Sequence, residues 1–478
     1  MEAEKALEAP PAAPAKGRGM WIGVVVVAIV IVILLAAVFG GLLGTPPAPT
    51  EKDKVLKIGT VLTLTGTSGL EVFGPKNQRG ALLAVAEINA AGGVLGNNIT
   101  IVNEDDTGVE ATARARAQKL VTSDRVDAIL GAVGSAFCQQ VLAVTEANGV
   151  VQISASCTSP VFSNLTYTGG WFFRTAPSDA LQGVVAANYS YVDRGFRTMG
   201  VIGNDNAYGR GLANVFANKF RAYGGTANVQ IFALGSTSYN SELTALISGT
   251  PGIEAIYMAN YPTDGLRVMQ DWYANPAWAS ISWVFSEGVL EQAGFVDRLY
   301  ANGIDANASG FQGSAPGAYL GVVGPLFNDF KTRYMAANSN EDPGLFTANA
   351  YDAVYLLAAA AQKAGEATAQ GIKDNIRAVA GSPGSQFHGG QWAAMRAAID
   401  SSTDVDYDGA SGAVNLDTYG DPLSGYGIWG VNITGKIITL KTYDESTVVA
   451  MTQGAPPMPV GTRSGIEVDW SATVRMEG

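Results

Sequence analysis

The chain has 478 residues, enough for two or three domains, and its 47% of apolar residues can form a large core. It carries 42 acidic against 30 basic residues, a net charge of −12, without a basic run, which argues against nucleic acid as a partner. The two cysteines, Cys138 and Cys157, either pair as a disulfide in an oxidising compartment or remain as two buried thiols.

The N-terminal region predicts a membrane anchor. Residues 1–20 are rich in Ala, Pro and Glu and are expected to form a disordered cytoplasmic tail. Residues 21–44 are 24 positions without a charge, enough to span a bilayer. Lys16 and Arg18 just before this segment favour a cytoplasmic location for residues 1–20. We expect an uncleaved signal anchor, a polar linker at 45–54 and all later residues outside the cell; a cleaved secretory signal peptide is the alternative. No cysteine directly follows for a lipid anchor, so we expect an archaeal or Gram-positive-like surface.

From residue 55 onwards, apolar strands alternate with amphipathic helices. The predicted strands are 55–62, 98–106, 126–131, 149–153, 170–177, 198–205, 227–234, 253–260 and 280–286. The predicted helices between them are 76–91, 110–123, 136–148, 178–193, 209–223, 239–249 and 263–274. This alternation, in two series that cover 55–177 and 178–312, predicts an α/β fold with parallel sheets covered on both faces.

The segment Gly131–Pro160 contains two turns rich in Gly, Ser and Thr, each directly after a strand. Neighbouring parallel strands bring such turns together at the carboxyl edge of the sheet, where open α/β folds bind ligands. Backbone N–H groups and hydroxyls there can hold an anion. Ordinary capping of the following helices is the alternative.

The C-terminal third is less regular. Residues 325–380 are predicted to be mostly helical, and 427–441 predict a hairpin around Thr434–Gly435. Residues 444–478, rich in Pro, Gly and Ser, remain an unassigned C-terminal tail.

The order of the segments resembles the type I periplasmic binding proteins, in particular the branched-chain amino-acid binding subunits of ABC importers. The matching motifs are LTGTSGLEVFG, RGALLAVAEINAAGGVLG, NEDDTG, GAVGSAF, ISASCTSP, FFRTAPSDALQG, NAYGRGLA, FSEGV, TANAYDAVYLLAAA and YDGASGAVNLD. The resemblance implies two doubly wound parallel-sheet lobes joined by a multi-strand hinge. Lobe 1 would comprise 55–177 and 315–424, and lobe 2 would comprise 178–314 and 425–443.

The resemblance also implies where the two charged ends of an amino acid would bind. The Ser135 hydroxyl matches a contact to the ligand carboxylate, and Thr158 matches a contact to both charged ends. The carbonyl of Cys157 falls at an acceptor position. Glu287 matches the carboxylate that pairs with the ligand ammonium, and Tyr261 matches an aromatic near that charge. Burying a zwitterion requires such partners, because neither charge is tolerated unpaired.

Two further aromatic residues match the walls of the site. Phe73 falls where an aromatic side chain touches the ligand side chain, and Tyr208 lies on the facing lobe; plain core packing is the alternative for both. We expect no enzyme, cofactor or metal site, since the single histidine, His388, has no catalytic or ligating partner nearby in sequence.

The function implied is a membrane-tethered receptor that passes a branched-chain or related small amino acid, or an amide, to ABC permease and ATPase subunits. The alternative is the ligand-sensing ectodomain of a signalling receptor with the same fold.

Overall fold

The computed structural model describes residues 54–305, 311–316, 320 and 324–453. The predicted tail (1–20), signal anchor (21–44) and all but the last residue of the linker (45–54) lie outside these residues. Within the described part, no helix is both long enough and apolar enough to cross a membrane.

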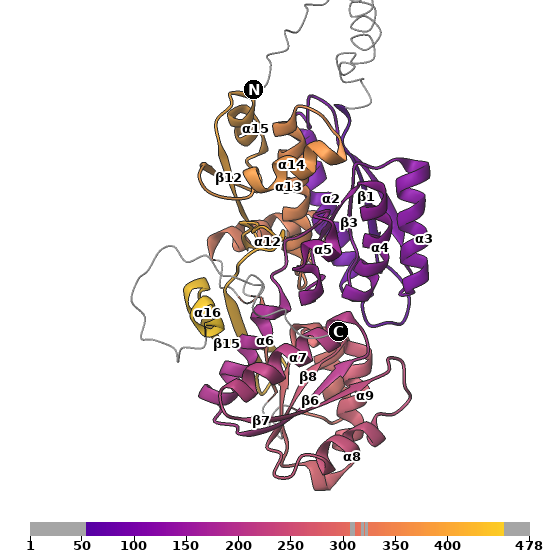
Figure 1. Ribbon diagram of the computed structural model, residues 1–478, viewed down its shortest axis with the longest axis vertical. Helices are drawn as coiled ribbons and strands as arrows, with labels where there is room; N and C mark the ends of the chain where they lie inside the picture. Colours follow the sequence, from indigo (N-terminus) through magenta and orange to yellow (C-terminus); the bar gives the residue numbers. More distant parts are fainter. Residues whose placement is uncertain (1–53, 306–310, 317–319, 321–323, 454–478) are drawn as a thin grey trace, which may run out of the picture. The chain divides into compact units, whose positions relative to one another are not determined.

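The first lobe is built on a five-stranded parallel sheet with the order β2-β1-β3-β4-β5 (Figure 1). Its strands are β1 (Lys57–Leu62), β2 (Thr100–Asp105), β3 (Ala128–Gly131), β4 (Val151–Ser154) and β5 (Phe172–Arg174). The helices that follow them are α2 (Gly74–Ala90), α3 (Glu110–Lys119), α4 (Ser135–Asn148) and α5 (Leu165–Thr168). Two later helices, α13 (Thr347–Ala364) and α14 (Ala369–Val379), also pack against this sheet.

Both faces of the first sheet are buried, as the apolar runs predict. Ala128 and Leu130 of β3 join the apolar cluster that contains α2 and α13, whereas Ile129 joins the cluster that contains α3 and α4. Successive side chains of a strand point to opposite faces, so one continuous apolar strand fills two cores.

The second lobe contains a seven-stranded sheet with the order β15-β14-β10-β9-β8-β6-β7. Its strands are β6 (Thr198–Asn204), β7 (Thr226–Phe232), β8 (Ala255–Ala259), β9 (Ser282–Phe285), β10 (Gln312–Pro316), β14 (Tyr426–Val431) and β15 (Ile437–Tyr443). The associated helices are α6 (Asp179–Asn188), α7 (Ala207–Ala222), α8 (Asn240–Ser248), α9 (Pro262–Tyr273) and α10 (Asp297–Ala301). β14 pairs antiparallel with β10 and with β15, so the predicted hairpin around Thr434–Gly435 is confirmed.

Helices cover this second sheet on both faces too. A Cβ at Gly203 of β6 would lie 2.6 Å from the backbone of α7, whereas one at Gly200 would lie 2.8 Å from Leu246 of α8. An odd separation along a strand places these two residues on opposite faces. The prediction of two α/β lobes with parallel sheets is therefore confirmed.

Between β10 and β14 the chain returns to the first lobe (Figure 1). The predicted helical region 325–380 divides into α12 (Pro325–Ala337), α13 and α14. The sequence did not predict α15 (Trp392–Asp400) or β11 (Ser385–His388), whereas residues 406–417 read as turn and strand. In the structure β11 forms a small sheet with β12 (Val405–Gly409) and β13 (Gly412–Ala413).

Leaving the segment 444–478 wholly unassigned was wrong for its first residues, because Glu445–Thr452 form α16. Asp444 caps this helix by accepting a hydrogen bond from the backbone N–H of Thr447 at 2.8 Å. Val448 and Met451 are buried against Leu181 of α6. The apolar face is only two turns long, too short for a periodic signal, and tertiary contact supplies its stability.

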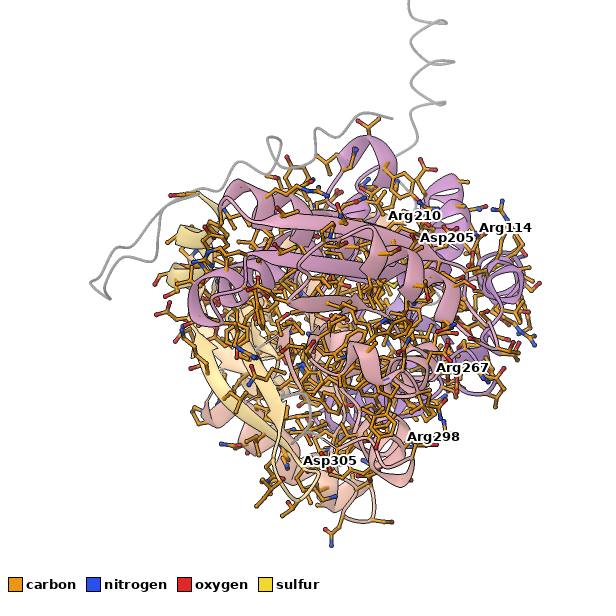
Figure 2. The ribbon with its side chains drawn as sticks, turned by 90° about the horizontal axis from the view of Figure 1, so that it is seen from below. Arg114, Asp205, Arg210, Arg267, Arg298 and Asp305 are labelled. Carbon is orange, nitrogen blue, oxygen red and sulfur yellow. A yellow bond between two sulfur atoms is a disulfide. The ribbon has the colours of Figure 1, made fainter. Side chains whose placement is uncertain are left out.

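Charged side chains lie mainly on the surface. Asp205 and Arg210, beside the start of α7, form an exposed ion pair at 2.6 Å, and Arg114, Arg267 and Arg298 also project outward (Figure 2). Exposed pairs of this kind contribute about 0–1 kcal/mol to stability.

Candidate ligand-binding site

A small cavity is lined by residues of both lobes. Its lining consists of Leu70, Phe73, Val133, Gly134, Ser135, Ser156, Tyr208, Tyr261, Glu287, Gly288 and Phe346. The cavity volume is about 20 Å³, which is the space of roughly one water molecule. The two lobes are thus closed on each other here, and a ligand of amino-acid size requires them to separate. The predicted residues Phe73, Ser135, Tyr208, Tyr261 and Glu287 are brought together in this cavity.

One wall is formed by the two small-residue turns after β3 and β4. Cys138 and Cys157 are disulfide-bonded, which settles the alternative left open by the sequence. The bond closes a loop of 19 residues, and such a constraint contributes about 3 kcal/mol to stability in the chain-entropy account. The Ser156 hydroxyl also donates to the carbonyl of Val133 at 2.8 Å, so the two turns form one fixed surface.

Ser135 begins α4 on this surface and is almost fully buried. Its hydroxyl oxygen accepts a hydrogen bond from the backbone N–H of Ser159 at 3.2 Å, which leaves the hydroxyl proton free to donate to a ligand oxygen. The position lies at the N-terminus of a helix of 14 residues, where the helix dipole favours a negative charge.

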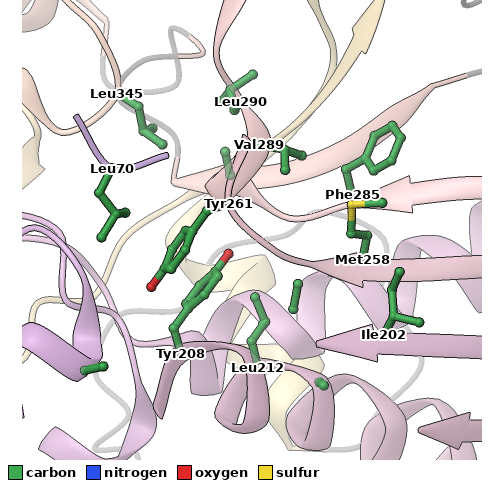
Figure 3. Close-up of a cluster of buried hydrophobic side chains, with 14 of the residues drawn as sticks. Leu70, Ile202, Tyr208, Leu212, Met258, Tyr261, Phe285, Val289, Leu290 and Leu345 are labelled. Carbon is green, nitrogen blue, oxygen red and sulfur yellow. The ribbon is translucent and has the colours of Figure 1, made fainter. Parts of the chain in front are cut away.

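The opposite wall belongs to the second lobe and contains two stacked tyrosines. The rings of Tyr208 from α7 and Tyr261, which precedes α9, lie 5.2 Å apart at 11° (Figure 3). Figure 3 places them next to Leu70, and their hydroxyls point to opposite ends of the pair. A Cβ at Gly134 would lie 2.7 Å from Leu70 and 3.2 Å from the Tyr261 hydroxyl, so the glycine favours this close approach of the first lobe.

Glu287 lies directly beyond β9 and is 2% exposed. The hydroxyl of Tyr208 donates to its Oε2 at 3.0 Å, and the Nε2 of Gln182 donates to the same oxygen. Burial raises the pKa of Glu287 to about 7, although these two hydrogen bonds act to lower it. Glu287 is therefore poised between its neutral and its charged form near neutral pH.

A second buried carboxyl group, Asp179, lies close by and was missed by the sequence analysis. Thr158 donates to its Oδ2 at 2.9 Å, and Oδ1 has no hydrogen-bond partner in the described part of the chain. Burial, followed by the charge of Glu287, raises the pKa of Asp179 well above its ordinary value. Asp179 starts α6, and an acid in a first helical turn is usually explained by the helix dipole, so the sequence offered no signal for this role.

Glu287 makes the cavity suitable for a cation. None of the residues that line it is a lysine or an arginine. Asp179 does not line the cavity, and the charge of Arg174 acts to lower its pKa. The charged form of Glu287, by contrast, is favoured when a positive group enters the cavity. No group of three His, Cys, Asp or Glu among the described residues is arranged to hold a metal ion.

Two predicted contact residues lie behind the cavity wall. Thr158 is occupied with Asp179, and the carbonyl of Cys157 accepts a hydrogen bond from Nη1 of Arg174 at 3.0 Å. Neither residue lines the cavity. Their direct contacts with a ligand stay predictions.

Arg174 organises the loop that carries Thr158. It is fully buried and forms two hydrogen bonds with Asp421, at 2.6 and 2.7 Å. It also donates to the carbonyls of Cys157 and Ser159 at 3.0 Å and to the hydroxyl of Ser163 at 2.8 Å. The guanidinium thus joins the end of β5, the loop after β4 and a segment 247 residues further along the chain.

Phe346 is another lining residue that the sequence did not indicate. It precedes α13 with a φ of 66°, in the left-handed region. A bulky residue rarely adopts this conformation unless the surrounding packing imposes it. Leu70 also lines the cavity without a specific sequence signal, whereas Ser156 belongs to the second of the two turns that the sequence predicted as an anion site.

Comparison with known proteins identifies similar molecules. The family model described as periplasmic binding protein matches residues 55–398. A leucine-, isoleucine-, valine-, threonine- and alanine-binding protein of Pseudomonas aeruginosa is 30% identical, covering 68% of this chain and 82% of its own length. A chemotactic signal transduction system substrate-binding protein, BasB of Halobacterium salinarum, is 26% identical over 77% of this chain and 85% of its own length.

Solved structures show the same fold. The substrate-binding protein LivJ of Streptococcus pneumoniae, in complex with isoleucine, superposes with a TM-score of 0.64 at 25% identity, covering 81% of this chain and 100% of its own. The leucine-binding protein LivK of Thermotoga maritima gives a TM-score of 0.66 at 22% identity, covering 82% of this chain and 99% of its own.

Proposed function

Because the chain belongs to the periplasmic binding protein family, we propose that it is the substrate-binding protein of an ABC importer and captures a branched-chain or similar small amino acid between its lobes. One observation carries the proposal: the buried carboxyl group of Glu287, without a basic residue among the lining, shares a cavity between the lobes with Ser135 and the donors of its turn. This arrangement suits a ligand with one positive and one negative end.

In the proposed complex, the ligand carboxylate lies at the N-terminus of α4 and accepts a hydrogen bond from Ser135. The ammonium pairs with the charged form of Glu287, close to Asp179. The side chain packs against Phe73 and Phe346. Hinge closure then removes the whole ligand from water, as in other two-lobed binding proteins.

The relatives support an apolar side chain, since the Pseudomonas protein is named for leucine, isoleucine, valine, threonine and alanine. We propose that the protein works outside the cell, tethered by residues 21–44, and hands its ligand to permease and ATPase subunits. Tethering would prevent its loss from a surface without an outer membrane.

A second function, sensing, is favoured by the similarity to the chemotactic substrate-binding protein of Halobacterium salinarum. Capture of the ligand is the same in both functions, and the partner differs. Affinity purification of the full-length protein from its own membranes, with leucine present, separates the two. Recovery of a permease and an ATPase supports transport, and recovery of a transducer without them supports sensing.

The ligand is tested by isothermal titration and thermal shift of the purified full-length protein. We expect saturable binding of leucine, isoleucine or valine, and stabilisation of about 2.7 kcal/mol at 100 times the Kd. Glutamate and benzoate serve as controls, because one adds a second negative charge and the other lacks an ammonium. Binding of benzoate but of no amino acid would refute the proposal.

The affinity is also expected to depend on pH. The pKa of Glu287 is raised to about 7, so below that pH the free protein holds a proton that the ligand ammonium must displace. The Kd should therefore rise about tenfold for each pH unit below 7 and stay level just above it. Titrations from pH 5 to 8 in buffers of different ionisation enthalpy should also detect a released proton below pH 7. A Kd that is constant over this range would contradict the role given to Glu287.

A further inference from the structure

A second, larger cavity lies directly beyond Phe73. Its volume is about 370 Å³, within the range of cavities that hold small molecules. Phe73 lines both this cavity and the small one described above, and it is 4% exposed. Its ring therefore stands as the partition between the two spaces.

Residues that are neighbours in the sequence line the two cavities. Gly288 lines the small cavity and Leu290 the large one, while Phe346 lines the small cavity and Leu345 the large one. Both leucines lie close to Tyr261 in the same apolar cluster (Figure 3). A side chain that leaves the small cavity past Phe73 thus meets the walls of the large one.

Those walls combine apolar and charged side chains, and the apolar ones form a continuous set beside Phe73. They include Val72, Leu290, Phe327, Leu345 and Ile437, contributed by both lobes. Four of the five charged lining residues pair within the lining: Lys331 pairs with Asp342 at 2.8 Å, and Lys76 lies 3.8 Å from Glu291. The fifth, Lys436, lies 3.8 Å from Asp297, which is not part of the lining. The remaining surface accommodates a hydrocarbon chain better than a second charged group.

We propose that the ligand site extends past Phe73 into this second cavity, so that the protein also binds L-α-amino acids with apolar side chains longer than that of leucine. The proposal rests on the function proposed above, in which Ser135 and Glu287 hold the charged ends. Phe73 then sets which side chains stay in the small cavity and which displace its ring and continue.

The size of the effect follows from the area buried. Each methylene group that leaves water improves affinity roughly fourfold. L-2-aminooctanoate has two side-chain carbons more than leucine. Its Kd is therefore expected to lie between that of leucine and a value about tenfold lower, because ordering the longer chain offsets part of the gain.

The test compares the two ligands on the wild-type protein and on a variant with the second cavity filled. Gly344 lines only the second cavity, and a Cβ there would meet the flexible end of Lys76 at 2.6 Å, which can move aside. Gly344→Leu should leave the Kd of leucine within about threefold and weaken L-2-aminooctanoate at least tenfold. Phe327→Trp, also confined to the second cavity, is the second filling variant if the first does not fold.

The variant Phe73→Ala tests the opposite change, in which the passage between the two cavities is opened. Removing the partition should raise the ratio of L-2-aminooctanoate to leucine affinity at least tenfold. Wild-type protein that binds leucine but not L-2-aminooctanoate would overturn the inference, as would a filling variant that weakens both ligands equally. Wild-type protein that binds neither ligand would instead contradict the proposed function.

Discussion

Glu287→Gln should weaken the binding of a branched-chain amino acid about 100- to 1,000-fold, since truncating one partner of a buried charge pair costs about 2–5 kcal/mol. Glutamine keeps the shape of the side chain and loses only the charge. In the proposed complex the ammonium then faces Asp179 alone, and the hydrogen bonds from Gln182 and Tyr208 no longer converge on an anion. Titration of the purified variant measures the loss directly.

Measuring the stability of the ligand-free protein distinguishes a loss of affinity from misfolding. The folded state holds a proton on Glu287 that the unfolded chain, with a pKa of 4.5, releases, so the contribution of Glu287 to wild-type stability falls as pH rises from about 4.5 to 7. The neutral amide that Glu287→Gln introduces removes that cost, so unfolding in urea at pH 8 should show a variant at least as stable as the wild type. Asp205→Asn, at the exposed ion pair, is the matched control and should change neither property (Figure 2). Unchanged binding in Glu287→Gln would refute the assigned role.

Arg174→Met should destabilise the fold by about 3–5 kcal/mol, because it leaves the buried charge of Asp421 without its partner. It also removes the donors to the carbonyls of Cys157 and Ser159. Ser159 donates its backbone N–H to Ser135, so the loop that supports the ligand site is expected to loosen as well. Urea unfolding at pH 7 gives the stability, and leucine titration gives the effect on the site.

Two further variants serve as controls for Arg174→Met. Arg210→Met breaks an ion pair of the same 2.6 Å length that is exposed to water, and it should cost less than about 1 kcal/mol. The double variant Arg174→Met with Asp421→Leu removes both buried charges and should recover much of the lost stability. A cost below about 1 kcal/mol for Arg174→Met alone, the level of an exposed pair, would show that the buried pair does not hold the loop.

The sequence was sufficient for the two α/β lobes and for much of the cavity wall. Short apolar runs alternated with helical periods, and a strand or helix depends mainly on such local patterns. Ser135 stood out because its small-residue turn follows a strand at the carboxyl edge of a parallel sheet. Glu287 follows a strand of the other sheet, and the family resemblance identified it. Their types, a hydroxyl and a carboxylate, match the chemistry of a zwitterion. The order of the motifs along the chain, which resembles that of the family, then assigned Ser135 to the first lobe and Glu287 to the second.

Other features depended on contacts that no local pattern encodes. Asp179 looks like an ordinary first-turn acid until Thr158 and Glu287 are placed beside it. Phe346 enters the cavity through a backbone conformation that its own residue type disfavours. Local sequence determined which segments are strands, helices and donor-rich turns. Only the tertiary structure decided that two buried acids influence each other, that the cysteines pair, and that Phe73 lines two cavities, because burial and charge coupling depend on residues far apart in the chain.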